Sequence, residues 1–266
     1  MSETDTPRVA VGGGGVAGLT AGTFCARAGL DTVVVVGHGE SILARNAYLA
    51  NVPGFPAGVD GRLFLELLEK QAGRNSCPFE QGLVAGLQAA EEGFRLRVES
   101  DEEFDLRADY VIVASWSDTD YLGDVDGVGL VDRGSKTYVD VDERGRTGVE
   151  GLYAAGRVAE KAHQAVMAAG HGAEVALALL EDSDVPFYYD WVAPEGYFTD
   201  RSREVPPGCE EIGEAERRRE RESMEVMTEA FEERYPDEPT MHRASSRSAM
   251  TTSDASRRLR ATEMTR

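Results

Sequence analysis

GGGGVAG, at residues 12–18, is the most informative stretch of this 266-residue chain. Within it, Gly13, Gly15 and Gly18 give the spacing G-x-G-x-x-G. In that pattern the first glycine forms a tight turn, the second lets the backbone approach a pyrophosphate, and the third lets a helix pack closely on a strand. The free N–H groups and positive dipole end of such a helix stabilise phosphates. The stretch therefore predicts a dinucleotide-binding turn if a strand precedes it and a helix follows.

The residues on either side supply that frame. A short apolar run at 9–11 precedes the glycines, and a helix rich in small residues follows them and ends at Gly29, where a positive φ caps its C-terminus. The β-branched run 32–36 then predicts a strand buried on both faces. This βαβ unit favours dinucleotide binding over a merely structural glycine turn.

The end of the second strand lacks the carboxylate that usually binds a ribose hydroxyl. Gly37, His38 and Gly39 follow the strand, and Glu40 is the first acid. Ribose recognition then uses backbone groups or Glu40, and His38 is either a cofactor contact or a solvated loop residue.

The pattern beyond this unit continues as an α/β domain. We expect an amphipathic helix at 64–73, a small antiparallel β element within 84–113 that leads into a buried strand at 110–114, and a strand at 152–154 with a long helix from about residue 163. Residues 1–184 are therefore predicted to form one Rossmann-like α/β domain, with helices packed on a parallel sheet.

Five stretches, in order, resemble the thioredoxin reductase branch of the pyridine nucleotide-disulfide oxidoreductases. The first two are the fingerprint VAVGGGGVAGLTAG and the strand TVVVVG. NVPGFP at 51–56 is similar to the N-x-P-G loop that lies along the flavin, and YVIVASWS at 110–117 stands where the family has a strand ending in A-T-G. GLYAAGRV followed by HQAVMAAGHGAEVAL stands where the family has G-[VL]-[FY]-A-A-G-D-V, then Q-A and a helix that points at the isoalloxazine.

The resemblance covers most of residues 8–181 and implies an FAD-binding domain, because its last stretch is typical of FAD sites and not of NAD sites. Together with the fingerprint, it assigns cofactor binding to Gly13, Gly15, Val16, Ala17, Gly18, Gly37, Glu40, Asn51, Val84, Ala114, Ser115, Gly156, Arg157, Val158, Gln164 and Ala165.

The chain departs from this family in its domains and cysteines. After the A-T-G strand the family carries an NADPH-binding domain with a second glycine fingerprint and a redox C-x-x-C pair, whereas residues 115–150 here hold neither a fingerprint nor a cysteine. Cys25, Cys77 and Cys209 are far apart in sequence and form no C-x-x-C pair or metal-ligand cluster. We therefore expect neither a dithiol relay nor a bound metal.

Further departures lie in the cofactor site itself. Arg157 stands where the family's aspartate accepts hydrogen bonds from the ribityl chain, and a guanidinium only donates. It either pairs with a flavin phosphate or ribityl oxygen, or it marks a weakened FAD affinity. Ser115 and Trp116 replace the threonine and glycine of A-T-G, and Trp116 either stacks near the cofactor or is a core or lid residue. His163 and His171 flank the last stretch, but neither stands out as a general base, so the catalytic residues are not identified.

The chain is strongly acidic. It has 48 acidic and 28 basic residues, a net charge of -20, and only three lysines, Lys70, Lys136 and Lys161. Such a surface repels nucleic acids and anionic membranes, and it is typical of proteins that work in concentrated salt, although an ordinary acidic cytosolic protein remains the alternative. The N-terminal residues MSETDTPRV show no cationic stretch followed by an apolar region, so we expect a cytoplasmic protein.

The sequence changes character after residue 184. Residues 185–240 hold six aromatic residues between Phe187 and Phe198 and a charged helix expected from about 210 to 234, and residues 241–266 are predicted to be a disordered tail. We expect the 185–240 extension to dock on the FAD domain or across a homodimer seam, because it is too short to bury a core of its own.

The sequence thus favours an FAD-dependent oxidoreductase without a redox disulfide, whose flavin exchanges electrons with a small molecule or a protein carrier. Two alternatives remain: a non-catalytic FAD-binding or interaction protein, and a reductase that binds NAD(P) at the single fingerprint.

Overall fold

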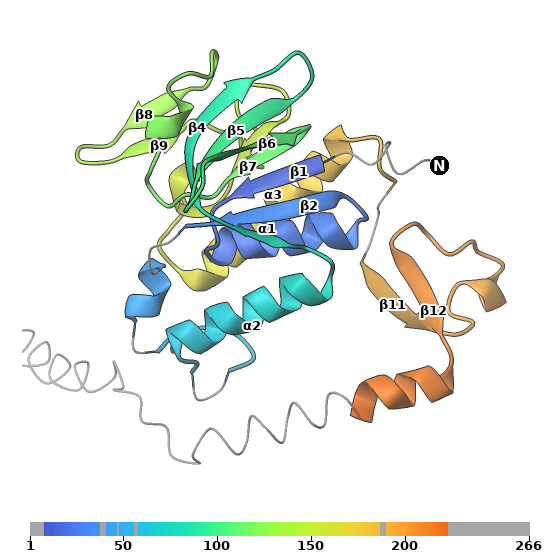
Figure 1. Ribbon diagram of the computed structural model, residues 1–266. Helices are drawn as coiled ribbons and strands as arrows, with labels where there is room; N and C mark the ends of the chain where they lie inside the picture. The colour runs from blue at the N-terminus through green and yellow to red at the C-terminus, as the bar shows by residue number, and fades with distance from the viewer. Residues whose placement is uncertain (1–7, 38–40, 47, 56–57, 187–189, 223–266) are drawn as a thin grey trace, which may run out of the picture.

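A computed structural model describes residues 8–37, 41–46, 48–55, 58–186 and 190–222 (Figure 1). Its centre is a five-stranded parallel sheet in the order β10-β7-β1-β2-β3. The strands are β1 (Arg8–Gly12), β2 (Asp31–Val36), β3 (Phe79–Gln81), β7 (Tyr110–Val113) and β10 (Leu152–Ala154). The predicted α/β fold with a parallel sheet is confirmed.

Both faces of the sheet are buried because its strands carry apolar side chains on both sides. Val34 packs into a core with the helices, while Val33 and Val35 face a second core on the opposite side. The helices of the first core are α1 (Val16–Arg27), α2 (Gly61–Arg74) and α3 (Ala165–Asp182). The second core is covered by the antiparallel strands β4 (Leu83–Ala89), β5 (Phe94–Glu99) and β6 (Phe104–Ala108), which confirm the predicted small β element (Figure 1).

Helix α3 is held in place by a close contact with α1 and by hydrogen bonds at its C-terminal end. Near the middle of the helix, Gly172 lies so close to α1 that a Cβ there would overlap the backbone of Ala17. At its C-terminal end, the Asp182 carboxylate accepts hydrogen bonds from the Arg146 guanidinium at 2.6 Å and from the Tyr153 hydroxyl at 2.8 Å. The helix that follows the GLYAAGRV stretch is therefore held at its middle and at its C-terminal end.

A short hairpin that the sequence did not predict lies in the connection from β7 to β10. It consists of β8 (Leu130–Asp132) and β9 (Thr137–Val139), paired antiparallel. Short 3-10 helices complete the connections: η1 (Ile42–Arg45), η2 (Asp120–Leu122), η3 (Gly156–Ala159) and η4 (Thr199–Arg201).

The extension after residue 184 corrects the prediction of a single helix from about residue 210. Strands β11 (Trp191–Pro194) and β12 (Cys209–Ile212) pair in parallel, and the charged helix begins only at Glu214. Glu211 pairs with Ala193 in this ladder, and its carboxylate accepts hydrogen bonds from the N–H groups of Gly196, at 3.0 Å, and Thr199, at 3.1 Å. The predicted continuation of this helix, the tail at 241–266, and residues 187–189 lie outside the described residues.

The extension meets the main domain through an ion pair between Arg27 of α1 and Asp190. Figure 1 shows β11 and β12 to one side of the parallel sheet. Docking of the extension on the domain or across a dimer seam remains a prediction. Within the part of the chain that the structure describes, no helix combines the length and the hydropathy needed to cross a membrane.

Candidate dinucleotide-binding site

A cavity of about 660 Å³ opens at the carboxyl ends of the parallel strands. Its walls include the residues that follow β1, β2, β7 and β10, on both sides of the point where the strand order reverses between β1 and β7. Parallel α/β sheets bind ligands at this point. The volume lies within the range of roughly 300–1,000 Å³ that is usual for ligand and cofactor sites.

The glycine turn forms the floor of the cavity, and its three glycines differ in their surroundings. Gly13 has φ 133°, and a Cβ there would overlap the carbonyl of Ala114; a Cβ on Gly18 would overlap the carbonyl oxygen of Gly13. By contrast, a Cβ on Gly15 would meet no atom of the described chain within 4 Å. The fold thus requires glycine at positions 13 and 18. At Gly15, by contrast, the missing side chain leaves an open space at the N-terminus of α1, which we call the cradle.

Two helices begin at this cavity without a side-chain cap from the described residues. Gly15 is the N-cap of α1 and Gln164 is the N-cap of α3, and neither makes a side-chain capping bond. Their first N–H groups and positive dipole ends are therefore available to phosphates or to electron-rich ring atoms. The Gln164 side chain is instead held by Asn51, whose amide donates to its Oε1 at 2.7 Å. This bond joins the N-x-P-G loop to the start of α3.

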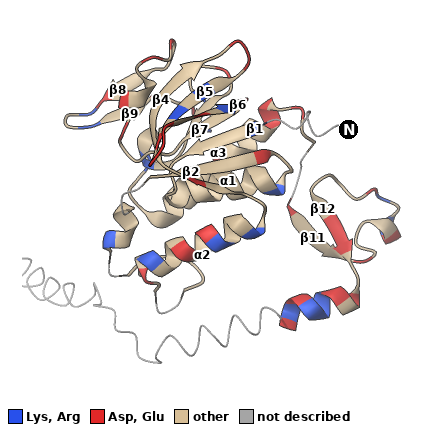
Figure 2. Ribbon diagram, in the orientation of Figure 1, with Lys and Arg blue, Asp and Glu red and all other residues tan. Residues whose placement is uncertain are grey.

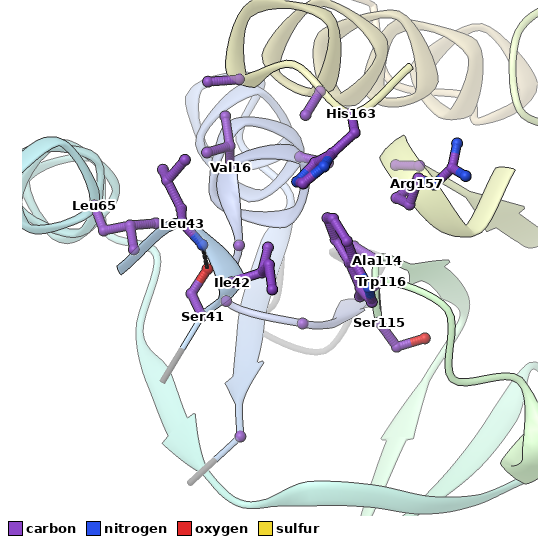
Figure 3. Close-up of a pocket in the computed structure, with 18 of the residues that line it drawn as sticks. Val16, Ser41, Ile42, Leu43, Leu65, Ala114, Ser115, Trp116, Arg157 and His163 are labelled. Atoms are coloured by element: carbon purple, nitrogen blue, oxygen red, sulfur yellow. Dashed lines mark hydrogen bonds between the residues drawn. The ribbon is translucent and has the colours of Figure 1, made fainter. Parts of the chain in front are cut away.

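Arg157 lines the cavity, but other residues engage its guanidinium. One nitrogen donates to the carbonyl of Lys161 at 3.0 Å, another donates to the Tyr138 hydroxyl, and the group lies 4.9 Å over the Tyr138 ring. Figure 3 shows it directed away from Trp116. Tyr138 comes from the β8–β9 hairpin, so the residue that replaces the family's aspartate is held by an element that the sequence did not predict.

His171 supports the cavity from behind. It is buried, with 3% of its surface exposed, and its Nδ1 accepts the N–H of Gly156 at 2.9 Å, which fixes the turn before Arg157. Burial, and to a smaller extent the nearby positive charge of Lys161, lower the pKa of this imidazole to about 4. The ring is therefore neutral near pH 7 and carries its proton on Nε2, which has no hydrogen-bond partner within the described part of the chain.

Trp116 and His163 meet at the cavity wall. Their ring centroids are 4.4 Å apart in an edge-to-face arrangement, and Figure 3 shows the two side chains pointing toward each other. Trp116 has φ 64°, a left-handed conformation that is costly for a residue with a Cβ. Lys136 of the hairpin places its ammonium 5.6 Å from the centre of the indole.

The structure brings most of the predicted cofactor residues together. The predicted residues that line the cavity are Gly13, Gly15, Val16, Ala17, Gly37, Ala114, Ser115, Arg157, Gln164 and Ala165. Gly18, Gly156 and Val158 support it from behind its wall, Asn51 reaches it through Gln164, and Val84 packs in β4 beside Gly12. Glu40 and His38 lie outside the described residues.

Sequence reasoning missed the opposite wall. Figure 3 shows Ser41, Ile42, Leu43 and Leu65 across the cavity from Trp116 and His163, and Arg45 and Glu69 also line it. The one sequence feature that could have indicated this wall is Ser41, because serine is common at the start of a helix. Its side chain accepts the N–H of Leu43 and caps η1.

Among the described residues, Cys25 and Cys77 lie in the core and not in the cavity lining. Both thiols are buried in the core between the sheet and the helices α1, α2 and α3. Burial raises the pKa of both, that of Cys77 to about 11. These thiols are therefore protonated and poorly nucleophilic. Among the described residues, no group of three or more His, Cys, Asp or Glu side chains is arranged to hold a metal ion.

Comparison with known sequences points to thioredoxin reductases. The enzyme of Dictyostelium discoideum is 25% identical over 129 residues, which are 46% of this chain and 40% of that protein. That of Pneumocystis jirovecii is 32% identical over 114 residues, which are 41% of this chain and 35% of that protein. The chain thus spans well under half the length of the curated relatives it matches. No protein-family model matches it.

Comparison with solved structures gives the same fold. A thioredoxin reductase from Gloeobacter violaceus superposes with a TM-score of 0.54 at 18% identity, covering 71% of this chain and 99% of that one. The chain therefore has a thioredoxin reductase-like fold over about two thirds of its length.

Proposed function

We propose that this chain, with its thioredoxin reductase-like fold, binds FAD non-covalently in the cavity and is a flavin-dependent oxidoreductase that lacks a redox-active disulfide. The observation that carries the proposal is the open cradle at Gly15, set between two helix N-termini that are uncapped by described side chains. Both features suit an elongated dinucleotide with a pyrophosphate in its middle.

Different residues of the site would bind different parts of this cofactor. The first N–H groups of α1 would bind the pyrophosphate at Gly15, and the start of α3, positioned by Asn51, would face the flavin ring. His171 would keep the Gly156 turn and Arg157 in place without adding charge, because it is neutral near pH 7. Bound FAD would itself supply the electron or hydride transfer.

The electron partners would act on the flavin directly. Cys25 and Cys77 are buried and protonated, so they are unsuited to relay electrons between the flavin and a second protein. We propose a small molecule or a carrier protein as donor and acceptor.

The first test is the absorption spectrum of the purified protein, before and after incubation with FAD and removal of free ligand. Bands of a bound flavin near 1:1 occupancy would support the proposal. A protein that binds no FAD would contradict the proposal, and one that binds NADH or NADPH instead would favour the nicotinamide alternative. Replacement of Cys25, Cys77 and Cys209 together should leave the flavin redox activity intact; its loss in a folded, flavin-loaded variant would contradict the absence of a dithiol step.

A second candidate function is a binding protein that holds FAD without turnover. It is favoured by the engagement of Arg157 with Tyr138 and Lys161, which leaves this replacement of the family's aspartate with few free donors. Anaerobic photoreduction followed by mixing with oxygen or with quinone acceptors separates the two. Rapid reoxidation indicates an oxidoreductase, and a flavin that binds but does not exchange electrons indicates a binding protein.

A further inference from the structure

Trp116 adopts a backbone conformation that its neighbours impose. Its φ of 64° is unfavourable for a side chain of this size. The turn is nevertheless fixed, because the Ser115 hydroxyl donates to the carbonyl of Asp118 at 2.7 Å and accepts from the buried Tyr121 hydroxyl at 2.9 Å. Strained conformations that the surroundings hold in this way are concentrated at ligand clamps and active sites.

The turn places the indole where segments from three parts of the fold converge. Trp116 follows β7, His163 precedes α3, and Lys136 comes from the β8–β9 hairpin. His163 meets the indole edge to face, so the ring is held in one orientation.

The indole also lies between the two ends of the candidate site. On one side is the glycine turn, where the backbone of Gly13 lies so close to Ala114 that an added Cβ would overlap its carbonyl. On the other side is His163, adjacent to Gln164 at the start of α3. A dinucleotide that runs from the glycine turn to α3 therefore passes the Trp116 side chain, which Figure 3 shows on the cavity wall.

We propose that Trp116 stacks on the isoalloxazine ring of the bound flavin, and that His163 is the positioning residue that orients the indole for this contact. The inference rests on the proposed binding of FAD. An indole is electron-rich and an isoalloxazine is electron-poor, so offset stacking between them is favourable. Lys136 adds a positive charge beside the pair, which favours electron density on the adjacent flavin.

The contact predicts a spectroscopic signature that does not depend on turnover. An indole in contact with an excited flavin passes one electron to it, and the electron returns to the indole within the pair, so no net reaction occurs while flavin emission is quenched. Wild-type protein should therefore bind FAD with strongly quenched flavin fluorescence. Trp116→Phe keeps a ring for stacking but is a poor electron donor, so it should bind FAD within a few-fold of wild type while flavin emission and its lifetime rise several-fold.

A second variant and a matched control complete the test. His163→Leu keeps Trp116 but removes its edge partner, so flavin emission should become heterogeneous, with a long-lived component absent from wild type. Trp116→Leu should weaken FAD binding about fivefold through lost stacking. Trp191→Phe changes the chain's other tryptophan, which lies in β11 outside the cavity, and should leave flavin emission unchanged.

Equilibrium dialysis separates the two possible failures. If wild-type protein binds no FAD, the proposed function and this inference both fail. If wild type binds FAD but its flavin emission and lifetime are the same in folded Trp116→Phe and His163→Leu, the stacking role is wrong and the proposed function stands. Far-UV circular dichroism verifies the fold of each variant, and His163→Leu decides the question if Trp116→Phe does not fold.

Discussion

At the scale of single residues, substitution of Gly15 is expected to change FAD binding but not stability, whereas substitution of Gly18 is expected to lower stability. A side chain at Gly15 enters the open cradle, so Gly15→Val should fold normally yet abolish FAD binding by blocking the pyrophosphate. A Cβ at Gly18 overlaps the Gly13 carbonyl, so Gly18→Ala should destabilise the protein by about 3 kcal/mol or more. Chemical denaturation and a flavin titration measure the two effects.

Gly29 provides the control for that pair, since it caps α1 away from the cavity and a Cβ there would meet no described atom within 4 Å. Gly29→Asn should cost little stability and leave FAD affinity unchanged, because asparagine tolerates the left-handed conformation. An unfolded Gly15→Val, or one with wild-type affinity, would contradict the assignment of the cradle.

His171 should make the stability of the protein depend on pH. Burial, then Lys161, holds the folded pKa at about 4, below the ordinary value of 6.5. Between these values the unfolded state binds more protons than the folded state, so stability falls as the pH falls from 6.5 towards 4. The loss from this one group is on the order of 3 kcal/mol.

The measurement is the free energy of unfolding by urea at several pH values. His171→Gln retains an acceptor for the Gly156 N–H but does not titrate, so its stability should change less steeply across this interval. A variant whose pH dependence parallels that of wild type would show that other groups, such as the paired carboxylates, account for the slope.

At the scale of elements, the β11–β12 pair depends on one carboxylate. Glu211 accepts hydrogen bonds from the backbone N–H groups of Gly196, Phe198 and Thr199 and from the Thr199 hydroxyl. Desolvation would raise the pKa of this carboxyl, but the N–H donors hold it at about 2. Glu211→Ala should therefore release the loop and unpair the strands.

Hydrogen exchange measures this release. Amides of residues 191–212 should lose protection in Glu211→Ala, while those of β1 and β7 keep it, because the carboxylate of Glu211 is bonded within the extension and not to the main domain. Glu210→Ala, on the exposed side of the same strand, is the control and should change little. A uniform loss of protection over both regions would show that the extension and the main domain unfold together.

The same elements show what the sequence can and cannot predict. The βαβ unit was predicted because its signals are local: glycine spacing, a β-branched run, and Gly29 with φ 89° as a helix terminator. Strands β8 and β9 have three residues each, too few to show an alternating pattern.

Strand β12 was predicted as part of a helix because the acids in CEEI suit a helix start. The role of Glu211 depends on a loop that only the folded chain brings near. Ser41 and Leu65 reach the cavity through the packing of η1 and α2, which sequence spacing does not encode.

At the scale of the whole molecule, the charge should make stability depend on salt. The net charge is -20, and Figure 2 shows acidic residues spread over helices, strands and loops. Molar salt shortens the screening length to about 3 Å and removes most of the repulsion among them. We expect the melting temperature to rise by about 10 °C or more between 0.1 and 2 M KCl, measured by circular dichroism. A melting temperature that is flat or falling over this range would contradict adaptation to concentrated salt.

The β8–β9 hairpin makes the protein suitable for domain insertion. Its turn is closed by a hydrogen bond from the Arg133 N–H to the Lys136 carbonyl at 2.8 Å, so the chain leaves and returns at nearly the same point. A guest domain with adjacent termini can therefore be inserted between Gly134 and Ser135 without stretching the host backbone. Lys136 lies over the indole of Trp116, so movement of the guest on binding its own ligand would pull directly on the cavity wall. In the proposed FAD-bound protein, we expect a fusion at this turn to convert a guest's ligand binding into a change in flavin colour or emission, so the hairpin is an attachment point for an optical sensor.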